Sequence, residues 1–253
     1  MSVTAYNSSE SWALSNYGKN GFAVERGLYS ASEIAEVRDL LLPLFDDFSD
    51  KLGDKIRDIG AVGDVEPGTC QPEIDRAVRL CPQLVKTSVY RKARALACDL
   101  LGRKAHYVFD HAISKMPFSQ TSTPWHQDKG YMKANTDLKT VNFWVPLQPT
   151  GPENGTLAYI PESHKHELLP HRRDDSLHPH VLKTDVDTTG AVYPCLRMGD
   201  LCLHHPLTVH SAGPNDTDQP RLAWSMHFGA YGRLEYLKPS NLWAMLRTPL
   251  TVS

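Results

Sequence analysis

The first hundred residues combine one short apolar run with two stretches that have the period of an amphipathic helix. The run at 21–27 predicts a short strand. Apolar side chains then recur every three or four positions over 34–48, which is the spacing of one helical face. The same spacing returns over 84–101 and ends at Gly102, a common helix stop. Residues 49–70 are polar, rich in glycine and without a period, so we expect a loop there.

A different texture begins at about residue 105, where short β-type runs alternate with Gly, Pro, Asn and Asp. Several short strands separated by turn signals are typical of an all-β sandwich or barrel. We therefore predict one domain over 1–253, in which a mostly helical part, 1–104, buttresses a β-core at 105–235. The predicted core strands are 106–113, 140–147, 156–160, 199–203 and 222–228.

The composition narrows the classes of function. Of the 253 residues, 41% are hydrophobic and 22% are charged, which is enough for a packed core without disulfides or structural metals. A formal charge of −2 gives no basic field for nucleic acid or for an acidic membrane. The expected partner is therefore a small-molecule substrate, and the composition indicates no particular oligomeric state.

Targeting and redox features favour the cytoplasm. The sequence has no run of about 18 apolar residues, and its N-terminus lacks the apolar segment of a signal peptide, so we expect neither a membrane span nor secretion. The five cysteines are irregularly spaced and form no CxxC pair. That pattern argues against a disulfide framework or a thiolate zinc site, and it favours a reducing compartment.

His126 and Asp128 stand two residues apart in a predicted extended segment. Side chains two apart on a strand point to the same face, so both can reach one ion. His210, at the end of the run 199–210, supplies a second imidazole. Two imidazoles and one carboxylate on one side of an ion form the facial triad of non-haem Fe(II) oxygenases. The triad leaves coordination positions open for 2-oxoglutarate and O₂.

A histidine near an acidic residue is common by chance, and His204 is an alternative ligand in the same predicted strand, although Pro206 interrupts it. His210 is the better candidate because a turn-rich segment, 211–220, and then Arg221 follow it. This segment predicts a hairpin that returns Arg221 to the metal strand. A guanidinium forms a two-pronged pair with a carboxylate, as the far carboxylate of 2-oxoglutarate requires.

The chain also carries four ordered motifs. They are WHQD at 125–128, NFWVPL at 142–147, ENGTLAYIPESH at 153–164, and HSAGPN at 210–215 followed by Pro220-Arg221. Together with the opening strand and helix over 21–44, they resemble the phytanoyl-CoA dioxygenase superfamily of Fe(II)/2-oxoglutarate enzymes. The resemblance implies a mainly β fold with flanking helices, built on a double-stranded β-helix (jelly-roll, cupin-like) core.

The resemblance also implies roles for seven residues. The family's iron ligands fall on His126, Asp128 and His210, its 2-oxoglutarate anchor falls on Arg221, and its cofactor pocket includes Trp144, Lys115 and Gln127. Two positions depart from the family pattern. Ala212 stands where the family often has a hydroxyl group, and Glu162 replaces a glycine in a turn.

The reaction implied by the resemblance uses Fe(II), 2-oxoglutarate and O₂. The protein is expected to oxidise, most directly to hydroxylate, a C–H bond of a small metabolite or natural-product intermediate, with release of succinate and CO₂. Two alternatives use the same barrel: a metal-dependent hydrolase with zinc in these ligands, and a non-catalytic binder of small molecules. A hydrolase has no need of Arg221 or Trp144 beside its metal.

The substrate side of the site carries no readable motif. Residues 49–83 and 165–195 are expected to form the lid and rim of the pocket. The histidines between 164 and 180 are expected to be solvated loop residues, whereas His111, on a predicted strand, is expected in the core or at the pocket wall.

Overall fold

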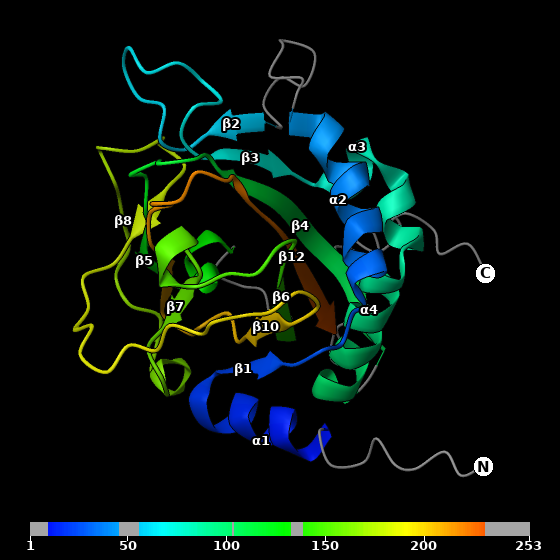
Figure 1. The fold of residues 1–253 in the computed structure, drawn as a ribbon. Helices are drawn as coiled ribbons and strands as arrows, with labels where there is room; N and C mark the ends of the chain where they lie inside the picture. Colours follow the sequence, from blue (N-terminus) through cyan, green and yellow to red (C-terminus); the bar gives the residue numbers. More distant parts are fainter. Residues whose placement is uncertain (1–9, 46–55, 103, 133–138, 231–253) are drawn as a thin grey trace, which may run out of the picture.

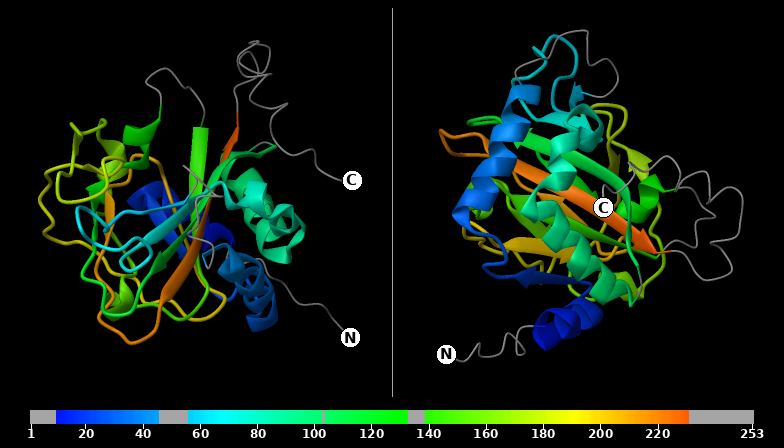
Figure 2. Two further views of the ribbon diagram at one scale, coloured as in Figure 1. Left: turned by 90° about the horizontal axis from the view of Figure 1, so that it is seen from above. Right: turned by 90° about the vertical axis from the view of Figure 1, so that its right-hand side faces the viewer.

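Two antiparallel sheets face each other in this computed structural model, which describes residues 10–45, 56–102, 104–132 and 139–230. Helices cover the outer face of the larger sheet, and the smaller sheet lies on its other side (Figure 1). Figure 2 shows the same layers from above and from the side of the helices. The expected mainly β, jelly-roll architecture with flanking helices is therefore confirmed.

The larger sheet contains most of the predicted core strands. In sheet order its strands are β1 (Phe22–Glu25), β10 (Leu201–His204), β6 (Lys139–Pro146), β12 (Arg221–Ala230), β4 (His106–Lys115), β3 (Pro72–Asp75) and β2 (Ile56–Asp58). The smaller sheet is β5 (Thr123–His126), β11 (His210–Ala212) and β7 (Leu157–Tyr159), and a separate ribbon pairs β8 (Arg172–Arg173) with β9 (Leu182–Lys183). Each of the predicted core strands has a counterpart among these.

The two predicted helices are confirmed as α2 (Ala31–Phe45) and α4 (Ser88–Leu101). Helix α4 begins later than predicted, because Thr87 accepts a hydrogen bond from the Tyr90 amide at its N-terminus and residues 82–86 form a separate 3₁₀ turn. It ends at Gly102, which adopts φ 63°. The polar helix α1 (Glu10–Asn20) and the short α3 (Ala77–Leu80) were not predicted. None of the described helices is long and apolar enough to cross a membrane.

Strand β12 shows how the fold positions the site, because successive side chains on a strand point to opposite faces. Its apolar residues pack into the core beneath the helices; they are Leu222, Trp224, Met226 and Phe228. Its polar residues line the cavity between the sheets; they are Arg221, Ser225 and His227. The strand therefore supplies the core on one face and the site on the other.

The expected loop at 49–70 is wrong in part. Its first residues, 49–55, lie outside the described residues, but Ile56–Asp58 form β2 against β3. The Asp58 carboxylate then accepts hydrogen bonds from four backbone amides, which orders the following turn; they belong to Gly60, Gly68, Cys70 and Gln71. With β1, β2 and β3, residues before 105 contribute strands as well as helices to the larger sheet.

Candidate active site

His126, Asp128 and His210 converge at one end of the space between the sheets. Their candidate ligand atoms all lie within 4.8 Å of one another. Strand β5 ends at His126, and Asp128 opens a 3₁₀ turn, η3 (Asp128–Tyr131). Gln127 between them remains extended, with φ −120° and ψ 131°, so the two flanking side chains still share a face. His210 is paired directly with His126 across β11 and β5.

Backbone carbonyls orient the two imidazoles. The Nδ1 of His126 lies 2.8 Å from the Pro124 carbonyl, and the Nδ1 of His210 lies 3.0 Å from the Thr208 carbonyl. Each Nδ1 is thus placed to donate its proton, which leaves Nε2 as the metal-binding atom. Each Nε2 lies 3.7 Å from the same oxygen, Oδ1 of Asp128.

The other oxygen of Asp128 is held from behind. Its Oδ2 accepts hydrogen bonds from the Asn142 amide and from His204 Nε2, the latter at 2.9 Å. The Nδ1 of His204 is in turn 3.2 Å from the Tyr159 hydroxyl. Such partners behind a ligand fix its orientation and leave the front oxygen free for a metal.

His204 and His210 do not share one strand, so the expectation of a single strand over 199–210 is wrong. His204 ends β10 in the larger sheet, and His210 begins β11 in the smaller one. Pro206 lies in the turn between them. His204 faces the site as a hydrogen-bond partner of Asp128, not as a member of the converging ligand set.

Electrostatics favours the protonation states that bind metal. Burial alone would raise the pKa of Asp128, but His210, His126 and His204 hold it well below its ordinary value. Burial, with His126 nearby, holds the pKa of His210 well below its ordinary value. An ionised carboxylate beside a neutral imidazole is the donor set that a divalent transition metal requires.

Arg221 is the main buried cation of the same cavity. It is 2% exposed, its Nε has no hydrogen-bond partner, and no described acid pairs with it. Burial lowers its pKa to about 9. The guanidinium lies 5.4 Å from the Trp144 ring, and both residues line the cavity. A buried cation without a counter-charge is unfavourable, so this end of the cavity fits a carboxylate group of a ligand.

Lys115 and Gln127 lie beside the cavity without lining it. Lys115 pairs with Arg221 across β4 and β12, and its Nζ donates to the Thr121 carbonyl at 2.7 Å. Burial and the charge of Arg221 hold its pKa well below the ordinary value. Gln127 points away: its Nε2 donates to the Leu207 carbonyl at 2.7 Å, and its Oε1 accepts from the Leu169 amide at 2.8 Å. Its described contacts are with protein groups and give no support for a cofactor contact.

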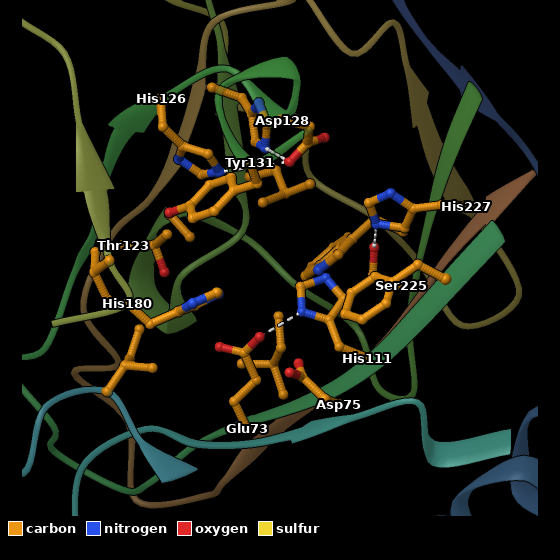
Figure 3. Close-up of a pocket in the computed structure, with 18 of the residues that line it drawn as sticks. Glu73, Asp75, His111, Thr123, His126, Asp128, Tyr131, His180, Ser225 and His227 are labelled. Atoms are coloured by element: carbon orange, nitrogen blue, oxygen red, sulfur yellow. Dashed lines mark hydrogen bonds and ion pairs between the residues drawn. The ribbon is translucent and has the colours of Figure 1, made fainter. Parts of the chain in front are cut away.

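The cavity has a volume of about 400 Å³ and continues away from the candidate ligands. Figure 3 shows Glu73 and Asp75 at the opposite end of the view from Asp128, with His111 next to Glu73. Ala212 also lines the cavity, so an apolar methyl group faces it where the family often has a hydroxyl.

Several cavity residues were missed by sequence reasoning. The alternation in Pro72–Asp75 places Glu73 and Asp75 on one face, which was a readable signal in a segment expected to be lid. Ser225 and His227 share a face with Arg221 by the same rule. His111 lines the cavity as expected. His180 is an exposed loop residue, as expected, and it also lines the cavity, while His171 accepts a hydrogen bond from the Gln127 amide.

Comparison with known proteins places the chain in a family. The model of the phytanoyl-CoA dioxygenase (PhyH) family matches residues 17–223. Human peroxisomal phytanoyl-CoA dioxygenase is 29% identical over 126 residues, which cover 47% of this chain and 37% of the human protein. A probable alpha-ketoglutarate-dependent hypophosphite dioxygenase of Stutzerimonas stutzeri is 30% identical over 162 residues, or 55% of this chain and 56% of that protein. The match therefore spans less than two thirds of either relative.

Solved structures match over a larger share of the chain. EvdO2 from Micromonospora carbonacea var. aurantiaca, complexed with 2-oxoglutarate, has 28% identity and a TM-score of 0.73, covering 91% of this chain and 93% of its own. The epimerase SnoN, in complex with Fe3+, alpha ketoglutarate and nogalamycin RO, shares the fold at 21% identity, with a TM-score of 0.70 over 96% of this chain and 91% of its own. Because the family model covers most of the chain, this protein belongs to the phytanoyl-CoA dioxygenase (PhyH) family.

Proposed function

We propose that this protein is an Fe(II)- and 2-oxoglutarate-dependent dioxygenase. In this proposal His126, Asp128 and His210 hold the iron, and Arg221 binds the far carboxylate of 2-oxoglutarate. One observation carries the proposal: a His-Asp-His set and a buried guanidinium without a described counter-ion open onto the same cavity. A hydrolase would need the metal set but would leave that cation without a purpose.

The comparisons support the co-substrate. EvdO2, which has 28% identity over most of the chain, was solved with 2-oxoglutarate bound. The Stutzerimonas relative carries alpha-ketoglutarate in its name. The chemistry of the described donors agrees with both, since two imidazoles and one carboxylate suit Fe(II), and a guanidinium suits a dicarboxylate.

The residues of this chain provide binding, orientation and exclusion of water. When bound, the iron couples oxidative decarboxylation of 2-oxoglutarate, to succinate and CO₂, with oxidation of the substrate. Arg221 fixes one end of the co-substrate, and the Trp144 ring lies along the guanidinium. Asn142 and His204 hold Asp128 so that Oδ1 faces the ligand side. Such preorganisation keeps the reacting groups in a productive relative orientation.

The substrate reaction that fits best is oxidation of a C–H bond, with hydroxylation as the simplest outcome. Asp128 occupies the carboxylate position of the triad, so no place is left there for chloride to bind and to be transferred. The substrate is proposed to be a small metabolite or natural-product intermediate, because a cavity of about 400 Å³ has the size of a small-molecule site.

Succinate formation tests this proposal. The protein is incubated with Fe(II), 2-oxoglutarate and O₂ in the presence of fractionated metabolite extracts. We expect one fraction to stimulate succinate release, in proportion to an oxidised product. Hydrolysis of an extract component with Zn(II), without 2-oxoglutarate, would instead identify a hydrolase.

A further inference from the structure

The wall of the cavity opposite the candidate ligands is a built polar surface. Glu73 and Asp75 project from β3, and His111 projects from β4, where it is paired with Asp75 in the register of the sheet. The Oε1 of Glu73 lies 2.7 Å from His111 Nδ1. All three side chains line the cavity, and Figure 3 shows them on its far side from Asp128.

Arg57 completes this wall from outside the cavity. Its Nη2 lies 2.5 Å from Asp75 Oδ1 and 3.7 Å from Glu73 Oε1. Burial alone would raise the pKa of Glu73, but His111 and Arg57 lower it to about 2, so this carboxylate is ionised. The pKa of His111 is raised, because Glu73 and Asp75 outweigh the effect of burial. The wall thus sets two carboxylates against one guanidinium and one readily protonated imidazole.

This charge balance limits what the wall can bind. The converging carboxylate oxygens of Glu73 and Asp75 and the ring nitrogen of His111 would suit a cation on geometry alone. Arg57, however, already supplies that positive charge at ion-pair distance. An anionic group would meet two carboxylates at this wall. The remaining cation of the cavity, Arg76, is engaged with the Phe109 ring at 5.2 Å and with the Val108 carbonyl at 3.4 Å.

A separate observation indicates that the wall has room for a hydrogen-bond donor from a ligand. Gln71 is 1% exposed and lines the cavity, yet its Oε1 has no hydrogen-bond partner in the described part of the chain. Its Nε2 donates to the Thr123 hydroxyl at 3.1 Å. A buried acceptor without a donor is unfavourable, so a ligand that supplies a hydroxyl would satisfy it.

Apolar side chains also line the cavity between its polar groups. Among them are Val108, Phe109, Ile113 and Met132. A ligand that satisfies both parts of the cavity has a hydroxyl-bearing edge and a C–H-bearing face, as a ring polyol has. Hydroxyl groups also donate and accept in the same place, which suits a wall with both carboxylates and an imidazole.

We propose that the substrate is a neutral, hydroxyl-rich small molecule, such as a ring polyol or glycoside, whose hydroxyl groups are bound by Glu73, Asp75 and Gln71. The inference rests on the proposed function, because it takes this cavity as the substrate site of the same dioxygenase. It assigns recognition to the wall and leaves the C–H-bearing face toward the candidate metal ligands.

Calorimetric titration of the full chain tests the inference with defined probes. The neutral panel is myo-inositol and the methyl glycosides of glucose, galactose and mannose. The matched probes are glucosamine, glucose 6-phosphate and cyclohexanol, which add a positive charge, add a negative charge or remove hydroxyls. We expect a member of the neutral panel to bind at least about tenfold more tightly than each matched probe, since one satisfied hydrogen bond has that effect.

Two variants connect the binding to the wall. Glu73→Gln should weaken the best neutral probe by about tenfold, because a hydrogen bond to a charged group becomes one to a neutral amide. Gln71→Leu removes the unpartnered acceptor without changing charge, and it carries the test should Glu73→Gln fail to fold. Glu66→Gln, on an exposed residue outside the cavity, is the matched control and should leave binding unchanged.

The titrations are run without metal and again anaerobically with Fe(II) and 2-oxoglutarate. Neutral probes that bind while no Fe(II)–2-oxoglutarate spectrum forms would refute the proposed function, although the wall would still be a site that binds hydroxyl groups. Tighter binding of a charged or apolar probe would overturn the inference. So would the absence of any neutral binding, or neutral binding that both wall variants leave unchanged.

Discussion

Replacement of Arg221 by methionine should separate co-substrate binding from folding. The guanidinium is 2% exposed, so water screens a bound carboxylate little. Truncation of one member of a buried, hydrogen-bonded charge pair raises the binding free energy by about 2–5 kcal/mol. At about 1.4 kcal/mol per tenfold, affinity for 2-oxoglutarate should fall by about thirtyfold to several thousandfold. Lys115 should not compensate, because its Nζ is committed to the Thr121 carbonyl.

The same variant should not lower the free energy of unfolding of the ligand-free protein. Arg221 has no described counter-ion, and its charge disfavours the charged form of Lys115, so its removal relieves an unfavourable burial. The assay is anaerobic titration of the Fe(II) protein with 2-oxoglutarate, followed by visible absorbance, beside denaturant unfolding without ligand. Arg76→Met, at the same cavity, is the control and should keep its 2-oxoglutarate affinity. Unchanged affinity in Arg221→Met, with a loss of stability, would refute the assignment and make Lys115 the next candidate.

Three further predictions test the roles of individual side chains. His210→Ala should abolish iron retention in equilibrium dialysis. His204→Ala removes only a hydrogen-bond partner of Asp128, so this variant should still bind iron, with an affinity about 10–100-fold weaker. Iron loss in His204→Ala and iron retention in His210→Ala would contradict the ligand set. In chloride buffer, mass spectrometry should show a product that has gained one oxygen or lost two hydrogens, and a chlorinated product would rule out Asp128 as a ligand. Glu73→Gln should unfold at a lower denaturant concentration than the parent protein at pH 7, because the pKa of Glu73 in the folded state, about 2, lies below its ordinary value of 4.5. The difference in stability should shrink as the pH falls from 4.5 towards 2. A difference that is constant with pH would contradict the ionised state of Glu73.

Local patterns predicted those parts of the molecule where one face of an element is apolar. The helical period around Ile34 and Val89 predicted α2 and α4, because both residues pack into the core. Strand parity brought His126 and Asp128 to one face, even though Asp128 lies just beyond the strand. The predicted hairpin after His210 is wrong, because β11 and β12 lie in different sheets, but the turn between them still brings Arg221 to the same cavity.

Features that depend on distant pairings were not predicted. The short strand β2 exists because it pairs with β3, and its following turn depends on the Asp58 carboxylate. His204 received its role from a contact with Asp128 across 76 positions of sequence, which no local pattern records. The far wall likewise forms only when β3 pairs with β4, so Glu73 and His111 carry no shared signal in the sequence.

The most direct test of the proposed function is the anaerobic absorption spectrum of the unmodified protein with Fe(II) and 2-oxoglutarate. Chelation of the 2-oxo acid by iron in the His126, Asp128 and His210 site should give a weak visible charge-transfer band. The band should saturate at one iron and one 2-oxoglutarate per chain, and it should be lost in the His210→Ala variant. A protein that binds Fe(II) tightly but forms no band at saturating 2-oxoglutarate would contradict its assignment as a 2-oxoglutarate-dependent dioxygenase.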